Sequence, residues 1–192
     1  MKKRIIALGL LWCLSAVMLQ AARVDTVLVR SAAMNKDVKV VYVLPDKAIG
    51  KQACPVVYLL HGYGGNARSW VQLKPELPQM ADEKGIIFVC PDGKNSWYWD
   101  SPENPAYRYE TFVTSELVKY TDGNYATIPD RKARAISGLS MGGHGALWSA
   151  IRHKDVFGAA GSMSGGVDIR PFPQNWDCLL YTSPSPRDLS TS

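Results

Sequence analysis

The sequence contains the segment Arg134-Ala-Ile-Ser-Gly-Leu-Ser-Met-Gly-Gly-His-Gly-Ala-Leu147, which passes from an apolar run through glycines into small residues. The apolar part predicts a short strand over residues 133–137, and the following part predicts a helix over residues 143–154. Between them stands Gly138-Leu-Ser-Met-Gly142, a G-x-S-x-G pentapeptide. A strand, a sharp turn flanked by glycines and a helix, in this order, are typical of the turn that presents a nucleophilic serine.

Ser140 is therefore the candidate nucleophile. The sharp turn is expected to lift its hydroxyl above the sheet, while the glycines on either side let the backbone pass close to itself. Met141 opens the helix, so its main-chain N–H is expected to point at the negative charge that develops on an attacked carbonyl oxygen. The alternative is a structural glycine-rich turn. The strand before the pentapeptide and the helix after it favour the nucleophile.

The rest of the chain predicts strands that alternate with helices. Two β-rich runs surround a polar turn and predict an antiparallel hairpin, and later apolar runs are typical of strands buried on both faces of a parallel sheet. Together with the serine turn, this order predicts an α/β protein with the α/β-hydrolase fold, in which helices flank a mostly parallel central sheet. The predicted strands are 24–30, 38–44, 56–60, 86–89, 133–137 and 159–164, and the predicted helices are 69–84 (interrupted by Pro75 and Pro78), 110–120 and 143–154.

A second glycine-rich segment, His61-Gly-Tyr-Gly-Gly-Asn66, directly follows the predicted strand 56–60. An α/β hydrolase takes its other oxyanion donor from the loop at this position, where glycines let a main-chain N–H approach the substrate. The N–H of Tyr63 is the candidate donor. His61 lies upstream of the serine, whereas this fold orders its triad as serine, acid and histidine, so we expect a structural role for its ring.

The catalytic base is expected to be absent from this chain. The sequence holds only three histidines, and none follows His153. His144 lies one turn beyond Ser140 and is expected to pack or to face solvent, and His153 lies near the end of a helix, where a cation is favourable. The base of the triad normally follows the last strand, so we expect the fold to be incomplete at its C-terminus.

The acid of the triad is expected to be missing as well. Asp168 and Asp177 are the late carboxylates that precede residue 178. Asp168 follows the last predicted strand, but capping of the local loop backbone is its more ordinary role. Asp177 adjoins the final segment of the chain.

The first 22 residues predict a signal peptide. Lys2, Lys3 and Arg4 precede an apolar run over residues 5–19, and the segment ends in Gln20-Ala-Ala22, where a signal peptidase finds small residues. A membrane anchor is the alternative, but this run is shorter than the ~20 residues of a spanning helix. We therefore expect no stable membrane anchor and an exported protein, periplasmic or secreted.

The signal segment also carries most of the formal net charge of +5. The remaining Lys and Arg residues are scattered among acidic residues, so the sequence predicts no nucleic-acid partner.

After the signal segment the cysteines are Cys54, Cys90 and Cys178. Cys54 is placed at the start of one predicted parallel strand and Cys90 at the end of its neighbour. Opposite ends of such strands lie on the order of 15 Å apart, well beyond the ~7 Å limit of a disulfide, so both are expected to be free and buried. The cysteines and histidines show no spacing typical of a metal site, and no cofactor is predicted.

The final segment, residues 178–192, resembles something other than protein-coding sequence. Cys178-Leu-Leu-Tyr-Thr-Ser-Pro-Ser-Pro-Arg-Asp188 matches the in-frame translation of the transposase adapter used in short-read sequencing libraries. A Ser/Pro-rich linker to a further domain is the alternative. We expect the native domain to occupy residues 23–177 and exclude residues 178–192 from the fold.

The chain resembles the esterase D and carbohydrate esterase family 1 group of α/β hydrolases, which includes feruloyl and acetyl-xylan esterases, S-formylglutathione hydrolases and mycolyltransferases. The resemblance covers residues 24–176. It is carried by His61-Gly-Tyr-Gly-Gly-Asn66, by Trp97-Tyr-Trp-Asp-Ser101 and by the segment from Arg134 to Leu147. It implies that Ser140 is the nucleophile, with the N–H groups of Met141 and Tyr63 as oxyanion donors. The family's acid and histidine match no residue of this chain.

The resemblance implies a serine esterase that acts on carboxylic esters, with an acyl, acetyl or feruloyl group on carbohydrate as the expected substrate. Trp97, Tyr98 and Trp99 are candidates for an aromatic wall beside the substrate, and buried support for the edge of the sheet is the other explanation. Three alternatives remain open at this point. They are a thioesterase similar to S-formylglutathione hydrolase, a mycolyl-type acyltransferase and a carbohydrate-binding relative without catalysis.

Overall fold

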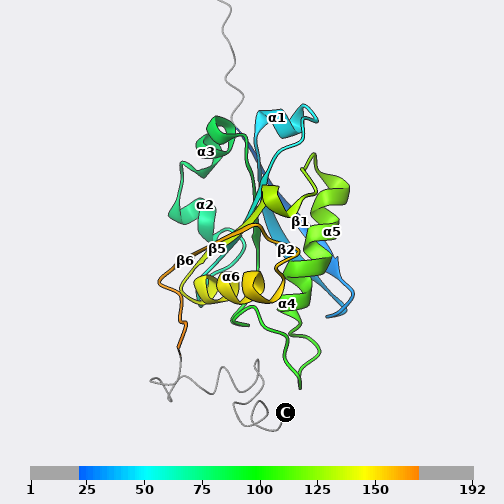
Figure 1. The fold of residues 1–192 in the computed structure, drawn as a ribbon, viewed down its shortest axis with the longest axis vertical. Coiled ribbons are helices and arrows are strands. Elements are labelled where there is room, and N and C mark those ends of the chain that lie inside the picture. Colours follow the sequence, from blue (N-terminus) through cyan, green and yellow to red (C-terminus); the bar gives the residue numbers. More distant parts are fainter. Residues whose placement is uncertain (1–21, 169–192) are drawn as a thin grey trace, which may run out of the picture.

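The computed structural model describes residues 22–168, which are drawn in colour in Figure 1. The predicted tail and all but the last residue of the predicted signal segment lie outside this range. The elements follow in the order β1 (Arg23–Ser31), β2 (Lys36–Leu44), α1 (Asp46–Ile49), β3 (Val56–Leu60), α2 (Ser69–Leu73), α3 (Leu77–Lys84), β4 (Ile87–Pro91), α4 (Tyr109–Thr111), η1 (Phe112–Glu116), α5 (Leu117–Asn124), η2 (Arg131–Ala133), β5 (Arg134–Leu139), α6 (Met141–Arg152) and β6 (Ala159–Met163).

The strands form one mixed sheet in the order β1-β2-β4-β3-β5-β6. The hairpin β1–β2 is antiparallel, as predicted, and β2 pairs antiparallel with β4, while β4, β3, β5 and β6 run parallel. Leu60 at the end of β3 pairs with Gly138 near the end of β5. Because neighbouring parallel strands end at the same edge of a sheet, this register brings the loop after β3 beside the turn after β5.

Alternate side chains of the strands pack into two hydrophobic layers, one on each face of the sheet. From β2, Tyr42 packs on one face with residues of η1, α5 and α6, whereas Val41 and Val43 pack on the other with residues of α2 and α3. Figure 1 shows α2 and α3 to the left of the sheet and α5 to its right. Full burial of a large apolar side chain contributes roughly 1.5–3 kcal/mol, so these two layers hold the sheet between the helices.

Most predicted elements are confirmed within a few residues, and two helices differ in detail. The predicted helix 69–84 is two helices, since Pro75 lies between α2 and α3 and Pro78 stands in the first turn of α3. Prolines are tolerated in a first turn because the N–H they lack has no partner there. The predicted helix 110–120 contains the wider turn η1 and continues to Asn124.

The sixth strand is exposed along most of its length. It pairs with β5, and of its five residues only Gly161 is partly covered. Met163 is 43% exposed and Val167, just beyond the strand, is 76% exposed. Within residues 22–168, β6 is thus an apolar edge of the sheet.

Cys54 and Cys90 are free and buried, as predicted. Burial raises the pKa of both thiols, which disfavours the reactive thiolate. Among the helices of the described residues, none combines the length and the apolar character that crossing a membrane requires.

Candidate active site at the end of β5

Ser140 stands alone between β5 and α6, at the point where the chain turns sharply. Its φ of 53° and ψ of −116° lie in a region that residues with a side chain rarely occupy. Its main-chain N–H donates to the carbonyl of Met163 at 2.8 Å, so the adjacent strand β6 helps to hold the turn. Ser140 is exposed, whereas Met141 after it is fully buried. The strained turn thus presents a hydroxyl to solvent at the N-terminus of a helix.

Glycines on both sides of Ser140 make this turn sterically possible. A Cβ atom on Gly138 would lie 2.2 Å from the carbonyl oxygen of Gly142, which excludes any side chain there. A Cβ atom on Gly142 would lie 2.2 Å from the carbonyl oxygen of Leu60 at the end of β3. The glycine pattern that marked this turn in the sequence therefore reflects contacts between main chains.

The loop after β3 lies directly beside the serine. A Cβ atom on Gly62 would be 3.6 Å from the Cβ of Ser140 and 3.4 Å from the carbonyl oxygen of Leu139. Neither the N–H of Tyr63 nor that of Met141 donates a hydrogen bond to any group within residues 22–168. Tyr63 is 57% exposed. The structure therefore brings together the serine and the two segments predicted to carry the oxyanion donors.

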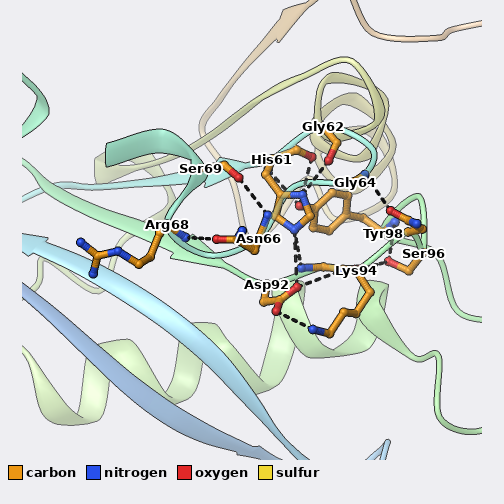
Figure 2. Close-up of polar contacts among 12 residues, drawn as sticks. His61, Gly62, Gly64, Asn66, Arg68, Ser69, Asp92, Lys94, Ser96 and Tyr98 are labelled. Atoms are coloured by element: carbon orange, nitrogen blue, oxygen red, sulfur yellow. Dashed lines mark hydrogen bonds and ion pairs between the residues drawn. The ribbon is translucent and has the colours of Figure 1, made fainter. Parts of the chain in front are cut away.

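His61 is buried, and both of its ring nitrogens are engaged (Figure 2). Gly93 N–H donates to Nε2 at 2.9 Å, so Nε2 is an acceptor and the ring proton is on Nδ1. Nδ1 then donates to the carbonyl of Gly62 at 2.7 Å. A ring held in this way cannot accept a proton from Ser140, which agrees with the structural role predicted for it.

Asp92 and Lys94 complete this polar cluster. Asp92 Oδ1 lies 3.7 Å from Nε2 of His61, and Asp92 Oδ2 lies 2.8 Å from Nζ of Lys94. Burial favours the neutral form of Asp92, but the hydrogen bonds that it accepts from Lys94, together with the charge of Lys94, outweigh burial and hold the pKa of the carboxyl well below its usual range. Asp92 is thus a charged residue beneath the loop after β3.

His144 packs rather than facing solvent. Its ring lies 5.5 Å from that of Trp97 and 4.8 Å from that of Trp99, measured between centroids, and 6.2 Å from that of Trp148. Its Nδ1 bonds to the carbonyl of Gly166 at 2.6 Å. Burial lowers the pKa of His144, although the bond to Gly166 opposes this shift. His144 therefore joins α6 to the loop after β6.

This packing separates the two tryptophans named as wall candidates. Trp99 is 8% exposed and contacts His144 and Trp148. This burial favours a supporting role for Trp99 over a place in a wall beside the substrate. Trp97 is only partly buried. Of the two, Trp97 has the greater surface left for a substrate.

His153 takes part in a network centred on Glu110. The carboxylate of Glu110 accepts hydrogen bonds from Trp148 Nε1 at 2.7 Å, Arg152 Nε at 2.7 Å and His153 Nε2 at 2.8 Å. Burial favours the neutral acid, but these three donors prevail and lower the pKa of Glu110. The network joins α4 to α6, and none of the three histidine rings hydrogen-bonds to Ser140.

Sequence reasoning missed Tyr98 and Glu110, whose roles depend on partners distant in the chain. Tyr98, predicted as part of the aromatic wall, is instead fully buried, and its hydroxyl bonds to the backbone of His61. Asp168 is exposed at the end of the described range, and Asp177 lies outside it. No group of His, Cys, Asp and Glu side chains within residues 22–168 is arranged to hold a metal ion.

A separate cavity of about 230 Å³ lies beside the hairpin. Its lining includes Lys36, Lys39, Lys94, Asp92 and Tyr109, but neither Ser140 nor Tyr63.

The chain is similar to known proteins in both sequence and structure. The model of the Esterase family ("Putative esterase") matches residues 31–186. An acetyl esterase of Caldicellulosiruptor saccharolyticus is 27% identical over 147 residues, which are 72% of this chain and 54% of that protein. The diacylglycerol acyltransferase/mycolyltransferase Ag85A of Mycobacterium gordonae is 34% identical over 155 residues, which are 76% of this chain and 43% of that protein.

Among solved structures, a ferulic acid esterase superposes with a TM-score of 0.71 at 31% sequence identity. The match covers 84% of this chain and 66% of that one. The chain spans about half the length of the curated relatives it matches.

Proposed function

Because this chain belongs to the Esterase family, we propose that it carries the nucleophile of a serine esterase that hydrolyses carboxylic esters. The observation that carries the proposal is the geometry of Ser140, an exposed serine held at φ 53° and ψ −116° between β5 and α6. The strain of that conformation is maintained by main-chain contacts that leave no room for a side chain at Gly138 or Gly142.

The proposed reaction has two steps. The Oγ of Ser140 attacks the ester carbonyl, its proton passes to a general base, and the alcohol leaves after protonation, so that an acyl-enzyme remains on Ser140. Water then attacks this ester and releases the acid. In both steps the carbonyl oxygen becomes negative, and the N–H groups of Tyr63 and Met141 are the proposed donors that stabilise it.

We propose that the general base and its acid partner come from parts of the whole protein other than residues 22–168. This proposal is supported by the partners of the three histidines present, since His61 and His153 are hydrogen-bonded elsewhere and His144 is half-buried among tryptophans. A triad requires a histidine within hydrogen-bond reach of the serine.

The proposed substrate is an acetyl, feruloyl or similar acyl ester of a carbohydrate. Two of the similar proteins are an acetyl esterase and a ferulic acid esterase, which supports this class of substrate. The partly exposed ring of Trp97 is the proposed contact for a sugar or an aromatic acyl group, because sugars and aromatic groups both pack on indole faces. Trp99 is a weaker candidate because only 8% of it is exposed.

An acyltransferase is the second candidate, favoured by the similarity to Ag85A of Mycobacterium gordonae. It would use the same acyl-enzyme but release it to a sugar alcohol in place of water. Product analysis with and without an added sugar acceptor separates the two reactions. The carbohydrate-binding alternative requires no chemistry at Ser140, so hydrolysis that depends on this residue contradicts it.

We further propose that residues 1–22 direct export, which places the enzyme in the periplasm or outside the cell. The basic start, the apolar run and the small residues at its end support this assignment. An exported enzyme would not meet a cytosolic glutathione thioester, so the carbohydrate ester is favoured over the S-formylglutathione-like alternative.

The decisive experiment replaces Ser140 in the whole protein expressed from the complete gene. Ser140→Ala should reduce hydrolysis of p-nitrophenyl acetate by several orders of magnitude, since loss of a triad serine costs about 10⁶-fold in kcat in subtilisin. Ser115→Ala, on the η1 segment, is the control and should leave the rate unchanged. Near-normal hydrolysis by a correctly folded Ser140→Ala variant would contradict the assignment.

A further inference from the structure

The peptide that links Gly62 to Tyr63 is fixed through its carbonyl oxygen. This oxygen accepts hydrogen bonds from Nδ1 of His61 at 2.7 Å and from the N–H of Gly65 at 3.0 Å. The carbonyl of Gly62 and the N–H of Tyr63 belong to one peptide unit, and residues 22–168 contain no cis peptide. In a planar trans peptide the two groups point in opposite directions, so donors that fix the carbonyl also fix the direction of the N–H.

The loop leaves its backbone little freedom to change this orientation. A Cβ atom on Gly65 would lie 2.8 Å from Nδ1 of His61, so the chain closes directly against the imidazole. Gly64 has a φ of +74°, and its N–H donates to Oδ1 of Asn95 at 2.8 Å. Tyr63 is therefore held from both sides by contacts of its neighbours.

Tyr98 holds the backbone of His61 itself. His61 N–H donates to the Tyr98 hydroxyl at 2.9 Å, and the same hydroxyl lies 3.3 Å from the carbonyl oxygen of His61, to which it donates. The ring of Tyr98 is fully buried and fits where glycines leave space. A Cβ atom on Gly93 would lie 2.3 Å from Cε1 of Tyr98, and one on Gly145 would lie 2.7 Å from its Cβ.

The buried ring of Tyr98 thus contacts three parts of the candidate site. Gly93 follows β4, His61 follows β3, and Gly145 belongs to the helix that begins after Ser140. Tyr98 adopts a φ of +60°, and Trp97 before it a φ of +55°. Such conformations persist only where surrounding contacts over-determine them, and the two bonds to His61 are contacts of this kind.

We propose that His61 and Tyr98 are positioning residues that hold the Gly62–Tyr63 peptide with its N–H directed to the oxyanion of the reaction at Ser140. Tyr98 fixes the backbone of His61, and the neutral imidazole of His61 fixes the carbonyl of Gly62. The role of the Tyr63 N–H as an oxyanion donor rests on the proposed function, whereas the orientation of the peptide can be tested independently of it.

Two substitutions of His61 separate its two ring contacts. In His61→Asn the side-chain amide occupies the place of Nδ1 and can still donate to Gly62, whereas in His61→Gln the amide reaches the place of Nε2 and retains only the contact with Gly93. With p-nitrophenyl acetate and the whole protein, we expect His61→Gln to lower kcat by about 10–100-fold with KM within about twofold, since loss of one oxyanion donor costs about 10²–10³. His61→Asn should recover most of that loss.

His153→Gln is the matched control, because it changes a histidine that bonds to Glu110 and should leave kcat unchanged. Tyr98→Phe removes only the hydroxyl and should lower kcat with little change in KM. This variant tests the proposal at its second residue, and it does so even if His61→Gln does not fold. Equal decreases of kcat in His61→Asn and His61→Gln, or effects on KM alone, would overturn the positioning role.

A measurement without substrate separates this inference from the proposed function. In the ¹⁵N spectrum of the imidazoles, His61 should be neutral with its proton on Nδ1, and the amide signal of Tyr63 should shift in His61→Gln and return toward the wild-type position in His61→Asn. If the wild type hydrolyses no ester but these signals behave as stated, the proposed function fails while the positioning of the peptide stands. A proton on Nε2, or a Tyr63 signal unmoved in His61→Gln, would overturn the inference.

Discussion

Gly142 lies against the end of β3 so closely that a Cβ atom on it would be 2.2 Å from the carbonyl oxygen of Leu60. The carbonyl oxygen of His61 would be only 2.7 Å away. The helix after Ser140 and the loop that holds Tyr63 are therefore spaced by main-chain contact. This spacing sets the distance between the serine and the predicted oxyanion donors.

Gly142→Ala should therefore destabilise the fold strongly. Because the obstacle is a backbone carbonyl that cannot rotate away, α6 or β3 must shift, and we expect a loss of about 2–3 kcal/mol in the free energy of unfolding. Gly123→Ala is the control, since nothing lies within 4 Å of the corresponding Cβ on α5, and it should add about 0.5–1 kcal/mol of stability. Urea denaturation of both variants measures the difference. Equal stability of the two variants would mean that the turn at Ser140 tolerates a side chain at position 142.

Glu110→Gln should weaken the contact between α4 and α6. The carboxylate accepts from Trp148, Arg152 and His153, and a neutral amide cannot serve three donors, so we expect a loss of about 1–2 kcal/mol at pH 7. The expected loss is small because the side chain of Arg152 is 54% exposed and solvent screens its charge.

The effect of Glu110 should depend on pH with a definite sign. Although burial opposes the charge, the three donors hold its pKa below the usual value of 4.5, so ionised Glu110 stabilises the fold above that pH. This contribution is lost as the pH falls through the lowered pKa. The difference in unfolding free energy between wild type and Glu110→Gln should shrink from pH 6 to pH 3. A difference that grows on acidification would contradict the network.

His144 should make the fold less stable in mild acid. Burial lowers its pKa, against the opposing bond to Gly166, so below the ordinary value of 6.5 the unfolded chain binds a proton that the folded chain does not. Stability is therefore present above pH 6.5 and declines as the pH falls toward the lowered pKa. His144→Asn keeps a donor for Gly166 and should flatten this decline between about pH 6.5 and pH 5 in thermal denaturation. An unchanged slope would mean that another group causes it.

The fragment of residues 23–177, expressed alone, should self-associate and be essentially inactive. The edge strand β6 is mostly exposed, and Met163 and Val167 present apolar surface there, so a second chain can pair with it. No histidine ring hydrogen-bonds to Ser140, so only weak catalysis from the oxyanion donors is expected. Light scattering and an esterase assay measure both properties. A soluble monomer whose turnover depends on Ser140 would contradict both expectations.

Local pattern was sufficient to predict most of the strands, the hairpin and the serine turn. These predictions rest on alternating side chains, apolar runs of strand length and paired glycines. All three are properties of neighbouring residues, so they can be recognised without a structure. Glycine at 138 and 142 marked Ser140 for the same reason. The wide turn η1 gave no such signal, because it does not alter the spacing of apolar residues enough to be seen.

The amino-acid sequence by itself determined the order of the elements and marked Ser140 as the candidate nucleophile, because both depend on residues adjacent in the chain. Only the tertiary structure decided how His61, Gly93 and Tyr98 share hydrogen bonds, and how Glu110 joins Trp148 across 38 positions. Such pairs form where two strands end at one edge or two helices cross. Their partners are chosen by the packing of the whole sheet, and no local spacing encodes that choice.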